Sequence, residues 1–269
     1  MMNLMRADMY RIFRGKAVYI TFGIMVLIVL LTVYVMRVGP TVGVTTEPLP
    51  EDTTIGELLA PVPEMSGSVA ANIALGSMNV LIYMLLPLFI VVATAAFSSG
   101  AVKNELPMGI SRMKYYFSKL VLSGLFTILA MLLFFVLHVL MAIPVDGVGY
   151  WGSGFVLDSL QIFGAQLFIM LAITAVGIFL CFATRRTGAV IGLYLAFLLA
   201  PSMIISIIAI GFENAMNLLN YELAHQILIF STFPARESYE IIRGLLIGAA
   251  FLVVPTAVGL ALFKRAEIQ

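Results

Sequence analysis

Long apolar runs separated by short polar connections dominate this sequence. Each run continues over about 20 residues, which is the length of helix needed to cross ~30 Å of hydrocarbon. Membrane-spanning strands would alternate between apolar and polar residues over roughly ten positions, so the unbroken runs favour helices, which satisfy their own backbone hydrogen bonds. The predicted spans lie near residues 17–36, 77–98, 120–143, 160–184, 188–210 and 244–263. We therefore predict a single all-α integral membrane domain over residues 1–269.

Composition strengthens the membrane assignment. Hydrophobic residues make up 62% of the 269 positions and charged residues only 11%, against about 25% charged residues in soluble domains. The net charge is +1, and the basic residues form thin belts beside the spans, which argues against a nucleic-acid partner. The single cysteine, Cys181, lies inside an apolar run and excludes an intrachain disulfide.

Positive charges collect on alternate connections. Of the 15 Lys and Arg residues, 12 lie in the N-terminal arm, the second and fourth connections and the C-terminal tail, whereas 11 of the 14 acidic residues lie on the other connections. Lys and Arg near span ends mark the cytoplasmic side of a membrane. Both termini are therefore predicted to be cytoplasmic.

Three segments outside the spans carry patterns of their own. Residues 1–16 predict a helix in the membrane interface, although a basic arm that only sets orientation is the alternative. Its apolar stripe consists of Met2, Met5, Met9, Ile12 and Phe13. The proline-rich, acidic connection at 37–76 predicts an irregular exposed segment. The apolar part of 211–243 is too short to span and predicts a re-entrant hairpin in the outer leaflet, with Glu213, Glu222 and His225 near water.

The span interiors lack Asp, Glu, Lys and Arg. Charges at helix centres are costly and occur mainly where ions or protons move, so their absence argues against a proton-coupled or ion-coupled transporter. His138 is the one titratable group well inside an apolar run. Because it lies near the outer end of the third span, an orientation toward the interface is favoured over a proton relay.

Small residues recur every four positions in the last two spans, which lets a second helix approach closely. The predicted packing positions are Gly188, Gly192, Ala196 and Ala200 in the fifth span and Gly244 and Gly248 in the sixth.

The second inner connection, residues 103–119, has the most specific pattern. Pro107 can begin a helix, and Ile110, Met113, Phe117 and Leu120 then share one face, with basic residues around them. We predict a short amphipathic helix along the cytoplasmic surface. Its basic residues either contact lipid head groups or make the helix a lever for a cytoplasmic partner.

This connection resembles the inner loop of the type-2 ATP-binding-cassette (ABC) exporter permeases. The resemblance rests on Asn104-Glu105-x-x-x-Gly109, Ser111-Arg112 and Ser118-Lys119-Leu120, with Gly109-Ile110 where family members usually have Gly-Thr. The order of arm, loops and spans is most similar to the small six-span permeases of peptide-antibiotic immunity and efflux.

The resemblance implies a permease subunit without its motor. The chain has no G-x-x-x-x-G-K-[S/T] motif, so it is predicted not to be an enzyme and to bind no cofactor itself. A separate cytoplasmic ABC ATPase would bind ATP and Mg. Two permease subunits, identical or different, would pair, each on one ATPase. The implied ATPase-coupling residues are Asn104, Glu105, Met108, Gly109, Ile110 and Arg112, with a smaller contribution from Arg185, Arg186 and Thr187.

The implied function is ATP-driven export of an amphipathic or hydrophobic peptide, antibiotic or lipid-like molecule across a bacterial plasma membrane. A sensor or immunity receptor without transport is an alternative. An intramembrane enzyme is a further one, but it would need converging polar catalytic groups, and His138 and His225 stand alone in sequence. No catalytic or metal-binding residue is predicted.

Single cysteines introduced at positions 50 and 110 should react with membrane-impermeant reagents from opposite sides of the membrane, because the two positions lie on connections of opposite charge type. Labelling of both positions from the same side would contradict the six-span topology.

Overall fold

The computed structural model describes residues 2–38, 65–98, 102, 110–231 and 238–265. All regular structure in these ranges is helical, and no strand occurs in them. Six helices are long and apolar enough to cross a membrane, which confirms the predicted all-α, multi-pass fold. These spans are α2 (Lys16–Val38), α5 (Val80–Phe89) continued by η1 (Ile90–Thr94) and α6 (Ala95–Ser98), α8 (Arg112–Asp146), α9 (Ser153–Thr184), α10 (Thr187–Ala209) and α12 (Ser238–Arg265).

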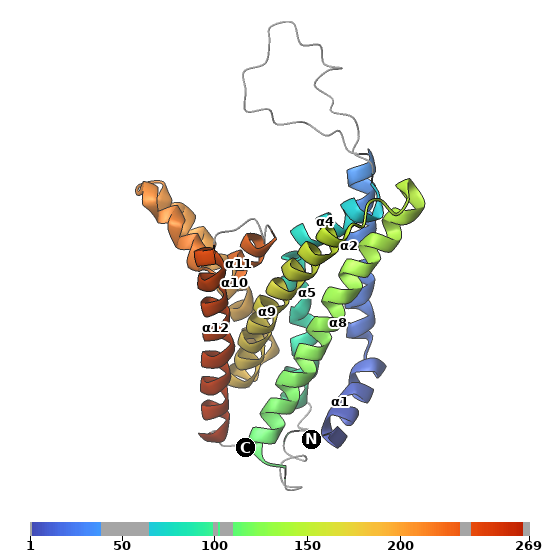
Figure 1. Cartoon of the computed structure of the whole chain (residues 1–269). Coiled ribbons are helices and arrows are strands. Elements are labelled where there is room, and N and C mark those ends of the chain that lie inside the picture. The colour runs from blue at the N-terminus through green and yellow to red at the C-terminus, as the bar shows by residue number, and fades with distance from the viewer. Residues whose placement is uncertain (1, 39–64, 99–101, 103–109, 232–237, 266–269) are drawn as a thin grey trace, which may run out of the picture.

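In the described part of the chain, four shorter helices lie at the two ends of the bundle (Figure 1). They are α1 (Met2–Arg14), α4 (Gly67–Gly76), the 3₁₀ helix η2 (Glu213–Tyr221) and α11 (Leu223–Phe230). The end that holds α1 and the last turn of α12 is called the terminal end here, and the end that holds α4 and α11 is called the far end. Helix α9 is central, because it contacts α4, α5, α8, α10, α11 and α12.

The second span is interrupted where proline removes a backbone donor. Pro87 lies inside α5, and a π-helical turn, η1, follows directly. Two side chains from other spans bind carbonyls beside this break: the Tyr194 hydroxyl donates to the carbonyl of Ile82 at 2.9 Å, and the Cys181 thiol donates to that of Phe89 at 3.7 Å. The break is therefore held by α9 and α10, as expected where proline interrupts a helix among other helices.

The far end contains a helix that the sequence pattern did not predict. Residues 67–76, placed in an irregular segment, form α4, whose small side chains allow close packing on α8 and α9. The Gln166 amide of α9 donates to the carbonyls of Leu75 at 2.8 Å and Ile227 at 3.1 Å, near the C-terminal ends of α4 and α11. At the other end of α4, the carboxylate of Asp146 accepts from the Met65 amide at 2.6 Å.

Two further expectations are corrected. Ile110 and Ser111 are not helical, and Ser111 has an extended backbone and caps α8, which begins at Arg112, so Met113 and Phe117 belong to the third span itself. The start of the predicted helix, at Pro107, lies outside the described residues. His138 does not turn toward water: it is fully buried, and its Nδ1 lies 2.9 Å from the Phe134 carbonyl.

The predicted outer hairpin corresponds to η2 and α11. Within it, Glu222 and His225 are half-buried. Whether this pair of helices enters the bilayer stays a prediction.

The two sets of small residues have different surroundings. A methyl group added at Gly248 would lie 2.7 Å from Cε1 of Phe168, and one added at Gly244 would lie 2.6 Å from Cζ of Phe230, so the sixth span packs closely on α9 and α11. In contrast, Gly188 and Gly192 are exposed, and a methyl group added at either would have nothing within 4 Å of it. Ala196 is also exposed, while Ala200 is half-buried. A partner for this ridge on α10 stays a prediction.

Replacement of Gly248 with Val should destabilise the fold, because the added atoms would overlap Phe168 and Ile169. Overpacking of this kind costs about 1–3 kcal/mol. Gly164→Val is the matched control, since it adds the same side chain at an exposed position of α9 where nothing lies within 4 Å. In detergent, the unfolding midpoint of the Gly248 variant should fall while that of the Gly164 variant should stay near wild type. Equal midpoints would contradict the packing assignment.

Candidate functional site

The N-terminal helix α1 buries one member of the stripe predicted for the membrane interface, Ile12, and exposes two others, Met9 and Phe13. Its buried face is formed by Leu4, Asp8 and Ile12, which repeat every four residues. Met9 and Phe13, on one flank of this face, are 40% and 43% exposed. In a membrane protein such apolar flanks are suited to contact lipid. The apolar residues of α1 are thus divided between the bundle and its surroundings. Asp8 lies in the middle of the buried face.

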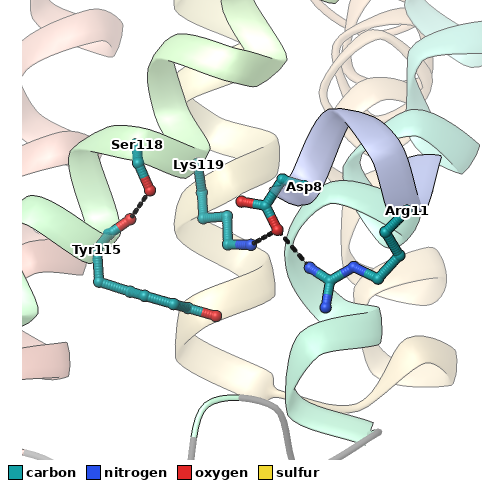
Figure 2. Close-up of polar contacts among 5 residues, drawn as sticks. All are labelled: Asp8, Arg11, Tyr115, Ser118 and Lys119. Atoms are coloured by element: carbon teal, nitrogen blue, oxygen red, sulfur yellow. Dashed lines mark hydrogen bonds and ion pairs between the residues drawn. The ribbon is translucent and has the colours of Figure 1, made fainter. Parts of the chain in front are cut away.

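Asp8 makes an ion pair with a lysine of the third span (Figure 2). The Lys119 ammonium lies 2.6 Å from Oδ1 of Asp8, and the Arg11 guanidinium lies 2.5 Å from the same oxygen. The Lys119 side chain is 0% exposed and that of Asp8 is 2% exposed. Since an isolated buried charge is very costly and a well-paired one is tolerated, the Lys119 ammonium requires Asp8, and α1 is held on α8.

Lys119 also contacts a residue of its own helix. Its ammonium lies 5.1 Å from the centre of the Tyr115 ring, within the range of a cation–π contact. Ser118 donates to the carbonyl of Tyr115 at 2.8 Å, and so its hydroxyl needs no other partner. Figure 2 shows Tyr115 and Lys119 extending toward α1 from adjacent turns of α8.

The first residue of α8 joins a third element. The guanidinium of Arg112 donates to the carbonyls of Phe263 at 3.1 Å and Lys264 at 2.7 Å, in the last turn of α12. The last carbonyls of a helix have no hydrogen-bond partner within it and carry partial negative charge. An arginine beside them donates the missing hydrogen bonds and compensates that charge. The start of α8 is thereby fastened to α12 as well as to α1.

Five aromatic side chains fill the space between these polar contacts. Phe182 of α9 is at the centre of the group, with ring centroids 4.7 Å from Tyr116 and 4.8 Å from Phe263. Phe97 of α6 and Tyr115 also contact Phe182, at 5.2 and 6.2 Å. The aromatic group therefore links α6, α8, α9 and α12. We call it, together with Asp8, Arg11, Arg112 and Lys119, the terminal junction.

The turn between α9 and α10 lies beside this junction. Arg185 has a left-handed backbone (φ 55°), ends α9, and places its guanidinium 5.9 Å from the centre of the Phe97 ring. Arg186 and Thr187 follow it and are exposed. Of the predicted minor coupling residues, Arg185 thus contacts the junction, and the other two face outward.

The structure describes only part of the predicted coupling segment. Asn104, Glu105, Met108 and Gly109 lie outside the described residues. Ile110 is half-buried against the hydrophobic core, and Arg112 binds the end of α12. The predicted site is thus divided, because Arg112 contributes to an internal contact of the bundle.

Asp8 was not predicted from the sequence as a site residue, and Lys119 was assigned to a basic belt. The signal for Asp8 was present: one acid in a basic arm, spaced four residues from both Leu4 and Ile12. The partner of Lys119 could not be found in the same way, because Asp8 is 111 residues away in the chain.

The described residues contain no group of three or more His, Cys, Asp and Glu side chains arranged to hold a metal ion.

Comparison with protein-family models finds no match, and comparison with curated proteins finds none either. The terminal junction itself joins α1, α6, α8, α9 and α12 through side-chain contacts.

Loss of the Asp8 carboxylate should leave the Lys119 ammonium without its partner. We expect Asp8→Asn to lower the free energy of unfolding by about 3 kcal/mol, in the range found when one member of a buried ion pair is removed. Lys119→Met should cost less, because Arg11 still neutralises Asp8. The double variant should be more stable than Asp8→Asn alone.

Unfolding in mixed detergent micelles would measure these differences as a double-mutant cycle. The exposed Lys114 provides the control, since Lys114→Met should change the stability by no more than about 0.5 kcal/mol. Strict additivity of the Asp8 and Lys119 substitutions would contradict a direct interaction between the two side chains.

Proposed function

We propose that this chain is the permease subunit of an ABC exporter, driven by ATP hydrolysis in a separate cytoplasmic subunit. The cargo is an amphipathic or hydrophobic molecule such as a peptide, an antibiotic or a lipid-like compound. Two permease subunits form the translocation unit, and the terminal end faces the cytoplasm, where the positive charges of the connections collect.

The terminal junction is the observation that carries this proposal. The second connection follows α6 and precedes α8 along the chain. Both helices belong to the junction, through Phe97 on one side and through Arg112 and Tyr115 on the other. A force on this connection would therefore act on α6 and α8, and through Arg112 and Lys119 on α12 and α1. Such an arrangement suits a protein that receives motion from a partner at this end.

The proposed ATPase contact is formed by Asn104, Glu105, Met108, Gly109 and Ile110, with Arg186 and Thr187 from the neighbouring turn. Arg112 and Arg185 have a different role in this proposal. They join the contact to the bundle, because both already bind elements of the terminal junction.

An apolar or amphipathic cargo agrees with the interior of the bundle. Lys119 is a buried cation of the third span, and Asp8 neutralises it. Other buried polar groups of the described spans are uncharged, such as the hydroxyls of Thr127 and Thr174, which lie 2.8 Å apart. The exposed ridge of Gly188, Gly192 and Ala196 on α10 is a surface on which a second permease subunit could approach closely.

Expression with its cognate ATPase should test the proposal. The detergent-solubilised wild-type chain should co-purify with the ATPase in a fixed ratio. Glu105→Lys should reduce the bound ATPase at least several-fold, because the charge of the proposed contact is reversed. The matched charge reversal, Asp158→Lys, changes an exposed acid at the start of α9 at the far end and should leave the amount of bound ATPase unchanged. Absence of any ATPase from the purified wild-type chain would favour a receptor without transport.

A further inference from the structure

A pocket of about 130 Å³ opens at the far end between α5, α10 and α11. Ile82, Leu198 and Leu228 supply apolar lining, one residue from each of the three helices. A cavity of similar volume, about 150 Å³, is enough to hold a benzene molecule. The pocket therefore suits a short apolar group rather than a whole lipid or peptide.

Polar side chains converge on the same pocket. Asn79, Tyr83 and Ser202 line it beside Glu222 and His225, which lie one helical turn apart. Two pockets lined mainly by α8 and α9 are, in contrast, almost wholly apolar. Binding sites for small molecules have this character: mostly apolar walls and a few placed polar groups that set orientation.

Glu222 supplies the carboxylate of this pocket. It is half-buried at the N-cap of α11, and burial raises the pKa of its carboxyl group. In the described ranges, no side chain donates a hydrogen bond to this carboxylate or forms an ion pair with it. A half-buried carboxylate gains from a cationic donor, which forms a stronger hydrogen bond than a neutral one.

The walls of the pocket are fixed by hydrogen bonds outside it. The Tyr194 hydroxyl joins α10 to α5 at the carbonyl of Ile82, at 2.9 Å. The Gln166 amide joins α11 to α9 at the carbonyl of Ile227, at 3.1 Å, and Gln226 donates to the carbonyl of Asn220 at 2.6 Å. A pocket whose walls are already ordered loses little entropy when it binds a ligand.

We propose that this pocket binds a primary ammonium group carried on a short apolar body, with Glu222 as its counter-ion and the apolar lining around its carbon atoms. The ethanolamine head group of a lipid and a soluble amine share this chemistry. The inference does not depend on an ATPase partner, and so it stands apart from the proposed transport function.

The test uses the full-length chain in nanodiscs of phosphatidylcholine and phosphatidylglycerol, with n-butylammonium as the probe and n-butanol as its neutral equivalent. Saturation-transfer NMR should detect binding of butylammonium to the wild type and much less of butanol. Glu222→Gln keeps the size of the side chain but removes its charge, and should weaken butylammonium binding about tenfold or more, as expected for loss of a charge-assisted hydrogen bond.

Asp158→Asn is the matched control, because it neutralises an exposed acid on α9 that does not line the pocket. It should bind the probe like the wild type. Equal binding to wild type and Glu222→Gln, or equal signals from butylammonium and butanol, would overturn the proposal. A second arm adds phosphatidylethanolamine to the nanodiscs. Competition with the probe identifies the lipid head group as the occupant, and lack of competition excludes it and favours a soluble amine.

Discussion

Main-chain carbonyls at helix ends and breaks must find hydrogen-bond donors inside an apolar bundle, because the surrounding hydrocarbon offers none. Here the donors are side chains of neighbouring helices. Gln166 reaches the ends of α4 and α11, Arg112 reaches the end of α12, and Cys181 and Tyr194 reach the two sides of the break around Pro87. Since each donor serves a particular carbonyl, these contacts select which helix lies beside which, in a bundle where apolar packing alone discriminates little.

The same requirement is stronger at the terminal end because a full charge is buried there. The ammonium of Lys119 cannot remain in the bundle without a carboxylate, and Asp8 brings the whole of α1 with it. Arg112 then adds α12, and the ring of Phe182 occupies the space between the joined helices. The far end is built differently, from small residues and amide contacts, and there Glu222 is left with a carboxylate that the described protein does not pair. At the terminal end a buried charge is paired within the bundle, whereas at the far end the proposed ligand site is built around an unpaired carboxylate.

Sequence patterns found the parts of the candidate site but not their connections. The basic character of Arg112 and Lys119 was evident, and a solvated belt was the ordinary interpretation of such residues beside a span. Their actual partners are the carbonyls of Phe263 and Lys264 and the carboxylate of Asp8, which lie more than a hundred residues away along the chain. No local pattern identifies such partners, because an exposed lysine and a paired buried lysine have the same sequence neighbours.

What the sequence by itself determined is the set of spans: a run of about 20 apolar residues in a bilayer can only satisfy its backbone as a helix, and all six runs are helical. Only the tertiary structure decided that residues 67–76 form a helix packed on α8 and α9. The small side chains of this helix allow close packing, which contributes to stability only when α8 and α9 lie beside it. The tertiary structure also decided that Gly248 is packed while Gly192 is open. The reason is physical: a helix in lipid forms because its own backbone groups bond to one another, which depends on local sequence. Burial and pairing of a side chain depend instead on which residues, distant in the sequence, pack against it.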